Sequence, residues 1–326
     1  MTDAAASLDR LRLAAGQVYR TFQPTPQYRW PLLGQRVGAE VWVKHENHTP
    51  IGAFKVRGGL TYFDRLVRER PHVKGVVSAT RGNHGQSLAF AGARARVAVT
   101  IVVPRGNSAE KNAAMRAFGA ELVEHGRDFD EAKARAEALA IERGLEYAPS
   151  FHKDLVVGVA TYALELFRAE PALDTVYVPI GLGSGVCGVI GARDALGLRT
   201  RIVGVVSDRA ACYSLSFKEK IPVKTDSALT FADGVAVRVP DPGALEIIRR
   251  GAERVVEVSD DEVAEAIRVL FSDTHSTAEG AGAAALAALM KEKPRSGQRV
   301  AVVLTGQNID RPMMQEVLAG RTPRVA

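Results

Sequence analysis

One lysine, Lys55, lies between glycines and small or apolar neighbours in the segment 52–58, which reads Gly-Ala-Phe-Lys-Val-Arg-Gly. A lysine in such a setting is poorly solvated, so the neutral form of its amine is favoured and its pKa falls. A neutral amine attacks carbonyl groups and forms a Schiff base. Most lysines in proteins are solvated surface charges, so this chemistry depends on which other segments the chain brings to Lys55.

A glycine-rich segment, Gly-Leu-Gly-Ser-Gly at 181–185, follows a predicted strand and precedes a small-residue stretch. Backbone N–H groups in such a loop, backed by a helix N-terminus, can cradle a phosphate. No Gly-Lys-Ser/Thr follows, so the segment is not a Walker loop, and Val186 stands where a dinucleotide fingerprint has its third glycine. For this loop alone, a tight turn between strand and helix is the structural alternative.

Two further segments are Thr-Arg-Gly-Asn-His-Gly-Gln at 80–86 and Leu-Thr-Gly-Gln-Asn at 304–308. Together the four motifs resemble the fold-type II pyridoxal-phosphate enzymes, and most of all the branch of threonine dehydratase and serine racemase. The resemblance runs from about residue 24 to about residue 310. It implies a tryptophan-synthase-β-like α/β fold, in which two open parallel-sheet domains hold pyridoxal 5'-phosphate in the cleft between them.

The resemblance also implies roles for individual residues. Lys55 would hold the cofactor as a Schiff base and, once released, remove the substrate α-proton. Asn83 would bond the phenolic oxygen of the cofactor, although a simple Gly-Asn turn is the alternative reading. The implied cofactor contacts are Phe54, Lys55, Asn83, Gly181, Leu182, Gly183, Ser184, Gly185, Gly234, Glu279 and Thr305. The implied contacts of the substrate carboxylate are Thr80, Arg81, Gly82 and His84.

Thr305 aligns with the Ser/Thr that bonds the pyridine nitrogen in these enzymes. A hydroxyl donates a hydrogen bond to an unprotonated ring nitrogen, whereas an aspartate would keep that nitrogen protonated and make the ring a stronger electron sink. A neutral ring supports a carbanion less well. We therefore expect prompt loss of a β-leaving group to be faster than transamination.

The expected activity is a dehydratase (ammonia-lyase) reaction of amino-acid catabolism. A β-hydroxy-L-amino acid such as threonine, serine, 3-hydroxyaspartate or phenylserine would give a 2-oxo acid and ammonia. The main rival is serine racemase, which carries a serine where this chain has Arg81, and arginine is a poor base. A β-replacement enzyme such as cysteine synthase is a second alternative. A non-catalytic ligand-binding protein is a third, which the presence of Lys55, Asn83 and Thr305 disfavours.

Other departures from the family pattern concern metal and regulation. Ala53 replaces a serine that is common beside the lysine, which could alter the pocket. The segment 207–211, Ser-Asp-Arg-Ala-Ala, offers few oxygen ligands where some relatives bind a divalent cation, so we expect no metal there. The chain ends at residue 326, so we expect neither a C-terminal regulatory domain nor feedback inhibition by isoleucine.

Hydrophobic residues make up 46% and charged residues 25% of the chain, which is an ordinary balance for a soluble globular protein. The formal charge is +6, but the basic residues are scattered, which disfavours a nucleic-acid surface. Cys187 and Cys212 lack metal-ligand spacing and suit buried thiols in a reducing cytoplasm. No signal peptide is visible in residues 1–7, and the small apolar run 281–290 is too short to span a bilayer. Many family members are dimers, so we expect a homodimer.

Strands and helices alternate along most of the chain, which predicts parallel sheets covered by helices. The predicted strands are 39–44, 75–79, 97–103, 121–124, 175–180, 201–206, 255–258 and 300–304. The predicted helices, with their caps, are 8–20, 87–93, 107–119, 128–144, 155–168, 259–271 and 280–290. Pro24, Pro26 and Pro31 predict an extended segment. The resemblance implies a large cofactor-binding domain, 1–74 with 150–326, into which a small substrate-binding domain, 75–149, is inserted.

Overall fold

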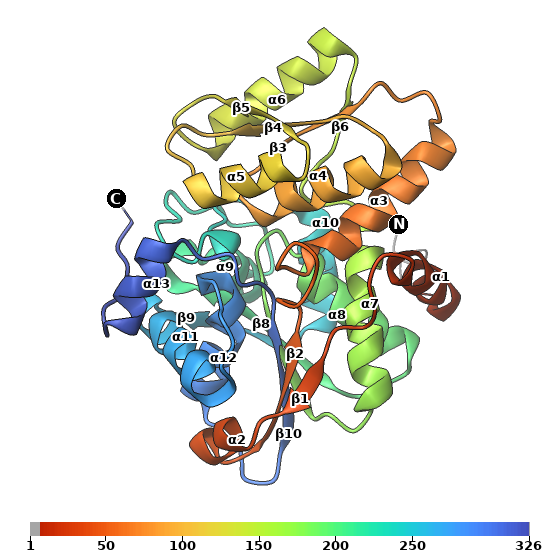
Figure 1. The fold of residues 1–326 in the computed structure, drawn as a ribbon. Helices are drawn as coiled ribbons and strands as arrows, with labels where there is room; N and C mark the ends of the chain where they lie inside the picture. Colours follow the sequence, from red (N-terminus) through yellow and green to blue (C-terminus); the bar gives the residue numbers. More distant parts are fainter. Residues whose placement is uncertain (1–6, 326) are drawn as a thin grey trace.

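The computed structural model describes residues 7–325, which fold around two separate β-sheets (Figure 1). The larger sheet has the strand order β1-β2-β10-β7-β8-β9, and all neighbours run parallel except β1 and β2. Its strands are β1 (Gln27–Arg29), β2 (Glu40–His45), β7 (Thr175–Pro179), β8 (Arg201–Ser207), β9 (Arg254–Val258) and β10 (Arg299–Leu304). The expectation about a signal peptide falls on residues 1–7, of which 1–6 lie outside the described part.

The smaller sheet has the order β5-β4-β3-β6, and its strands are all parallel. They are β3 (Val76–Ala79), β4 (Val99–Val103), β5 (Glu121–Glu124) and β6 (Glu146–Tyr147). All four come from the part of the chain that the sequence assigns to an inserted small domain. The mixed α/β architecture with parallel sheets is the predicted one, and the domain boundaries themselves stay a prediction.

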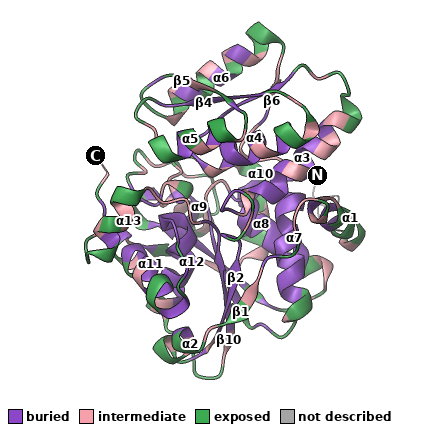
Figure 2. Ribbon diagram, in the orientation of Figure 1, coloured by how far each residue is buried: buried purple, intermediate pink, exposed green. Residues whose placement is uncertain are grey.

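Helices cover both faces of each sheet (Figures 1 and 2). On the larger sheet, α1, α7 and α8 lie on one face and α2, α11 and α12 on the other. On the smaller sheet, α6 covers the outer face, and α3, α4 and α5 lie on the face toward the larger sheet. The helices are α1 (Leu8–Tyr19), α2 (Pro31–Val37), α3 (Lys55–Glu69), α4 (Asn83–Ala95), α5 (Ala109–Ala117), α6 (Phe129–Arg143), α7 (Lys153–Ala169), α8 (Ser184–Ala195), α9 (Cys212–Glu219), α10 (Pro242–Gly251), α11 (Asp260–Thr274), α12 (Gly280–Glu292) and α13 (Arg311–Leu318), with 3-10 turns η1 (Asp208–Ala210) and η2 (Asp233–Val235).

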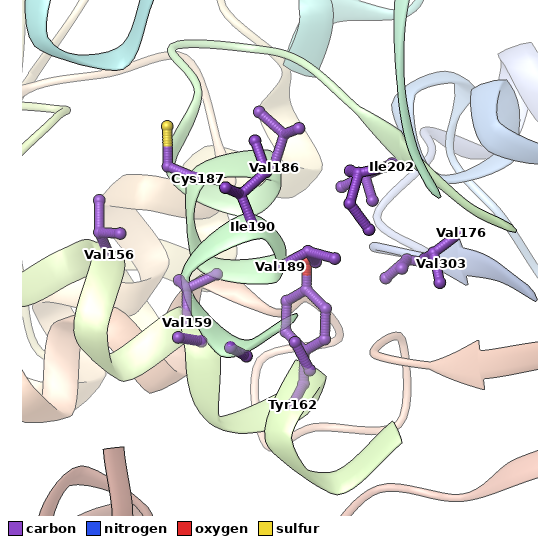
Figure 3. Close-up of a cluster of buried hydrophobic side chains, with 14 of the residues drawn as sticks. Val156, Val159, Tyr162, Val176, Val186, Cys187, Val189, Ile190, Ile202 and Val303 are labelled. Carbon is purple, nitrogen blue, oxygen red and sulfur yellow. The ribbon is translucent and has the colours of Figure 1, made fainter. Parts of the chain in front are cut away.

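Alternation along the central strands explains how one sheet supports two cores. Val176 and Val178 of β7 pack with α7 and α8, as the close-up in Figure 3 shows for Val176, whereas Tyr177 packs with α11 and α12. Successive side chains of a strand point to opposite faces, so a strand buried on both faces is apolar throughout. This burial fixes the carboxyl ends of the strands, where the candidate site residues lie.

Two predicted details of the fold are wrong, for local reasons. The cap of α5 is Ser108, whose Oγ accepts a hydrogen bond from Lys111 N, and not Asn107, one residue earlier. Pro31 does not continue an extended segment but occupies the first turn of α2, a position that tolerates proline because its missing N–H has no partner there. In contrast, the predicted capping box of Ser259 and Glu262 is confirmed at the start of α11.

Two features are absent from the described residues, 7–325. No helix in that range is long and apolar enough to cross a membrane. Within the same range, no group of three or more His, Cys, Asp or Glu side chains is arranged to hold a metal ion. Cys187 and Cys212 are both buried and unpaired with each other, and burial raises the pKa of each thiol.

Candidate active site

Lys55 is the first residue of α3, and the backbone just before it is joined to the end of β10. The amide of Phe54 donates a hydrogen bond of 3.0 Å to the carbonyl oxygen of Thr305, and Ala53 forms an antiparallel bridge with Gly306. The first and last of the four sequence motifs therefore lie side by side. The remaining two motifs follow β3 and β7. Three of the motifs therefore lie directly at strand carboxyl ends, the usual place for ligands in parallel sheets, and the Lys55 motif is joined to one of these ends.

The amine of Lys55 is poorly solvated, as the sequence predicts. Its side chain is half-buried, and its Nζ lies 5.1 Å from the centre of the Phe54 ring. Burial lowers the pKa of Lys55 to about 8, and the nearby Glu279 carboxylate opposes this shift. An amine with such a pKa is present largely as the neutral base at mildly alkaline pH, which suits nucleophilic and general-base chemistry.

A buried ion network holds the first turn of α3. Arg57 is fully buried and donates to Glu46 Oε2 at 2.7 Å and to Glu165 Oε1 at 2.7 Å. Lys44 Nζ donates to the other Glu165 oxygen at 2.6 Å. Two cations thus face two carboxylates, which is the condition under which buried charges are tolerated. The network joins α3 to β2 and α7 immediately beside Lys55.

Asn83, the first residue of α4, is oriented by hydrogen bonds on both sides of its amide. Its Nδ2 donates to Glu279 Oε1 at 2.6 Å, and its Oδ1 accepts from Asn308 Nδ2 at 2.8 Å. Asn308 Nδ2 also donates to the carbonyl of Ile51 at 2.9 Å. Among residues 7–325, no acceptor takes the second N–H of Asn83, which is left available as a donor. Asn308 is part of the motif at 304–308, but no role was predicted for it from the motif.

The loop that leads into α4 gathers three of the four predicted substrate contacts. Thr80 and His84 are buried, and the Gly82 amide donates to Thr80 Oγ1 at 3.1 Å. Burial lowers the pKa of His84 to about 3, with a further contribution from the charge of Lys55. The buried His84 Nε2 has no hydrogen-bond partner among the described residues. Arg81, the fourth predicted contact, is exposed.

The glycine loop 181–185 connects β7 to α8. Gly183 precedes α8 with φ +102°, a left-handed value that favours glycine. A Cβ on Gly181 would lie 2.4 Å from the carbonyl oxygen of Gly234, and one on Gly183 would lie 2.6 Å from Ala244 Cβ. Tyr213 donates to the carbonyl of Leu182 at 3.1 Å, which fixes the loop from behind. Ser184 is buried as the first residue of α8.

These features fit the cofactor that the resemblance implies. A glycine loop at the N-terminus of α8 can take the phosphate, and Lys55 offers an amine of lowered pKa. One N–H of Asn83 is left unpaired among the described residues, and the hydroxyl of the buried Thr305, which is 3.4 Å from the Ala281 carbonyl, could instead donate to a ring nitrogen. The direct contacts with the group stay a proposal, residue by residue.

A second lysine in the site was not found from the sequence. Lys111 of α5 is buried, and its Nζ lies 2.5 Å from Asp233 Oδ2 and 3.8 Å from Glu279 Oε2. Those two carboxylates raise the pKa of Lys111 against the opposing effect of burial. Its neighbours in sequence are polar and charged, a pattern typical of a solvated helix face, so no signal in the sequence marks it as buried.

Residues 18–306 match the family model described as pyridoxal-phosphate dependent enzyme. The L-threonine ammonia-lyase of Geobacter sulfurreducens is 37% identical over 279 residues, which is 85% of this chain and 69% of that protein. The biosynthetic L-threonine dehydratase of Salmonella typhimurium is 34% identical over 297 residues, 90% of this chain and 58% of that protein. The chain thus spans little more than half the length of the latter.

Solved structures of related enzymes have the same fold. The processed form of threonine deaminase isoform 2 from Solanum lycopersicum superposes with a TM-score of 0.87 at 29% identity, covering 97% of this chain and 95% of that one. Maize serine racemase gives 0.90 at 25% identity, covering 97% and 98%. The chain belongs to the family of pyridoxal-phosphate dependent enzymes, with the fold-type II architecture. Its cofactor is accordingly pyridoxal phosphate.

Proposed function

We propose that this enzyme is an ammonia-lyase that converts a β-hydroxy-L-amino acid to a 2-oxo acid and ammonia by α,β-elimination. The observation that carries the proposal is the hydrogen bond from the Phe54 amide, next to Lys55, to the Thr305 carbonyl, together with the hydrogen bond that Asn308 of the same motif donates to Asn83. Relatives named L-threonine ammonia-lyase and threonine dehydratase, similar over most of this chain, support it. Threonine, serine, 3-hydroxyaspartate and phenylserine share the reacting atoms and are the candidate substrates.

The chain's own residues bind the substrate and remove its α-proton. Pyridoxal phosphate, when bound, draws electrons away from the α-carbon of an amino acid. Lys55, whose pKa is lowered to about 8, takes the α-proton as a general base. Thr80 and the N–H groups at the start of α4 bind the substrate carboxylate, because a helix N-terminus favours an anion. His84 stays neutral near pH 7, since its pKa is lowered to about 3.

The remaining predicted contacts would hold the cofactor. The loop 181–185 would take the phosphate through backbone N–H groups and the Ser184 hydroxyl. Thr305 would donate to the ring nitrogen, and Phe54, Gly234 and Glu279 would line the cleft. Mass spectrometry after borohydride reduction tests the attachment, because the cofactor mass has to fall on the peptide that carries Lys55.

Racemisation is the second candidate, because serine racemase and aspartate racemase are among the structural neighbours at 25–27% identity. It needs an acid–base group on the face opposite Lys55. Arg81 is exposed and is a poor base, which favours elimination. We therefore propose racemisation as a side activity at most.

The test is to incubate the holoenzyme with the four candidate L-amino acids and measure 2-oxo acid, ammonia and D-isomer in parallel. The proposal requires 2-oxo acid and ammonia in equal amounts from at least one of them, with little D-isomer. D-isomer without ammonia would reject the lyase in favour of the racemase. Inertness toward all four, with turnover of an activated serine and a thiol, would favour β-replacement.

We also propose that the enzyme is a homodimer and that it is located in the cytoplasm. Its large domain would comprise residues 1–74 and 150–326, and its small domain residues 75–149. Tyr28 on the edge strand β1 and Leu32 on α2 are each 52% exposed, which suits contact with a second copy. Light scattering behind a sizing column measures the mass, and a monomer at micromolar concentration would reject the dimer. Cell fractionation tests the location.

A further inference from the structure

The first turn of α5 spans the junction between the two sheets. Ser108 Oγ donates to Asp310 Oδ1 at 2.6 Å, and Glu110 Oε1 accepts from the Arg311 amide at 3.0 Å. Lys111 completes the set by donating to Asp233. One helical turn next to the smaller sheet thus contacts the part of the chain that forms the larger sheet at three points. Of these three α5 side chains, that of Lys111 also extends toward Glu279, which lies near Lys55.

The path of the Lys111 side chain is set by the loop before α4. A Cβ on Gly82 would lie 2.9 Å from Lys111 Cδ, so the aliphatic part of the lysine packs directly on that glycine. The amine is thereby delivered to Asp233 and Glu279 and not to solvent. A lysine 7% exposed, with its charge between two carboxylates, is a built feature of the site.

Glu279 is the link between Lys111 and the amide of Asn83. One carboxylate oxygen, Oε1, accepts from Asn83 Nδ2, and the other, Oε2, has no hydrogen-bond partner among the described residues. Oε2 is the oxygen that lies 3.8 Å from Lys111 Nζ. As long as Glu279 accepts at Oε1, the Asn83 amide keeps its N–H groups toward the site.

We propose that Lys111 is a positioning residue, whose buried ammonium keeps the Glu279 carboxylate in place as the acceptor that orients the Asn83 amide beside Lys55. The inference rests on the active site assigned under the proposed function, but not on which amino acid is the substrate. It assigns to α5 a role in tuning the site that none of the four motifs contains.

The charges around Glu279 predict the sign of each perturbation. Among the described residues, the charged groups that face it are Lys55 on α3, Lys111 on α5 and Asp233 on η2. Burial raises the pKa of Glu279 to about 7, Lys111 and Lys55 lower it, and Asp233 raises it. Removing Lys111 therefore favours the protonated acid, whereas removing the Asp233 charge favours the carboxylate.

The experiment compares wild-type holoenzyme with Lys111→Met and Asp233→Asn, reading the absorbance of the bound cofactor against pH. We expect the midpoint of the absorbance change on the acid side of the titration to follow the protonation of Glu279. This midpoint should rise by about 1 pH unit or more in Lys111→Met, since an opposite charge within about 4–6 Å shifts a pKa by about 1–3 units. In Asp233→Asn the midpoint should fall. Lys111→Arg, which keeps the charge, should restore the wild-type midpoint at least in part.

Lys133→Met is the matched control, because Lys133 on α6 pairs only loosely with Glu137 at 3.8 Å and its side chain is 49% exposed. It should leave the midpoint unchanged. Coincident midpoints for Lys111→Met, Asp233→Asn and wild type would overturn the proposal, as would shifts of the same sign. The readout needs no substrate, so failure of the proposed lyase activity leaves this test intact. If Lys111→Met does not fold, Asp233→Asn and Lys111→Arg still decide it.

Discussion

The amide of Phe54 and the carbonyl oxygen of Thr305 are joined by a hydrogen bond of 3.0 Å. The backbone that presents Lys55 is therefore held against the end of β10 by main-chain atoms. The Thr305 side chain plays no part in that contact, because its hydroxyl reaches toward the Ala281 carbonyl instead. Placement of the lysine and the proposed hydrogen bond from Thr305 to the cofactor ring should thus be separable by mutation.

Thr305→Val should lower the rate of 2-oxo acid formation by about tenfold while leaving the cofactor covalently attached. The reason is that one hydrogen bond to the ring nitrogen is lost, at about 1–1.5 kcal/mol, and Lys55 stays in place. Steady-state rates and reductive trapping measure the two effects. Lys55→Ala is the comparison, since it should lose attachment and activity together. Loss of attachment in Thr305→Val would contradict the separation.

Gly183→Ala should weaken cofactor binding by about tenfold or more. Its φ of +102° disfavours an L side chain, and the new Cβ would lie 2.6 Å from Ala244 Cβ, so the loop has to shift. Gly197→Ala is the control, because Gly197 also has a positive φ, +64°, but a Cβ there would meet no atom of the described part of the chain within 4 Å. Fluorescence titration of cofactor-free protein should show wild-type affinity for the control alone.

Arg57→Met should destabilise the fold by about 3–5 kcal/mol, because it leaves the buried Glu46 and Glu165 carboxylates without their main cation. Urea unfolding of the two proteins measures the difference. Arg127→Met removes a charge from an exposed pair with Glu131 and should leave the midpoint unchanged. Equal stability of Arg57→Met and wild type would show that the buried network contributes nothing.

Lys55 should make the stability of the cofactor-free protein depend on alkaline pH. Its pKa is about 8 in the folded chain against 10.5 as the usual value, so between these limits the unfolded chain binds more protons. Relative to Lys55→Met, wild-type stability should rise with pH across that window, by at most about 1.4 kcal/mol per pH unit. Chemical unfolding at pH 7.5, 9 and 10.5 gives the difference, and a constant difference would contradict a lowered pKa.

Much of the site could be predicted because its chemistry is local in sequence. Lys55 and the glycine loop are marked by their neighbours, and the lowered pKa of Lys55 follows from the apolar segment around it. The alternation of apolar strands with capped helices was enough to predict parallel sheets. Arg57 lies in the same segment as Lys55, but its burial could not be predicted from the sequence. That burial depends on ion pairs with Glu46 and Glu165, which come from other segments of the chain.

The residues that were missed owe their roles to tertiary contacts. Lys111 is buried only because α5 lies across Gly82 and meets Asp233 and Glu279 from the other part of the chain. Asn308 acts through Ile51 and Asn83, and nothing in its own segment indicates this. Burial of polar side chains between two sheets leaves no periodic pattern in the sequence, so it is seen only in the folded structure.

The loop 80–86 follows β3 of the smaller sheet, whereas the glycine loop follows β7 and Thr305 follows β10 of the larger one. Lys55 begins α3, and the residue before it is hydrogen-bonded to the end of β10. Apart from Asn83, the candidate cofactor contacts are therefore positioned by the larger sheet, and the candidate substrate contacts by the smaller one. Substitutions in the smaller sheet and its loops can change substrate preference over evolutionary time without eroding cofactor affinity. Because of this separation, single substitutions could change the preferred substrate, and the exposed Arg81 is the first position to consider.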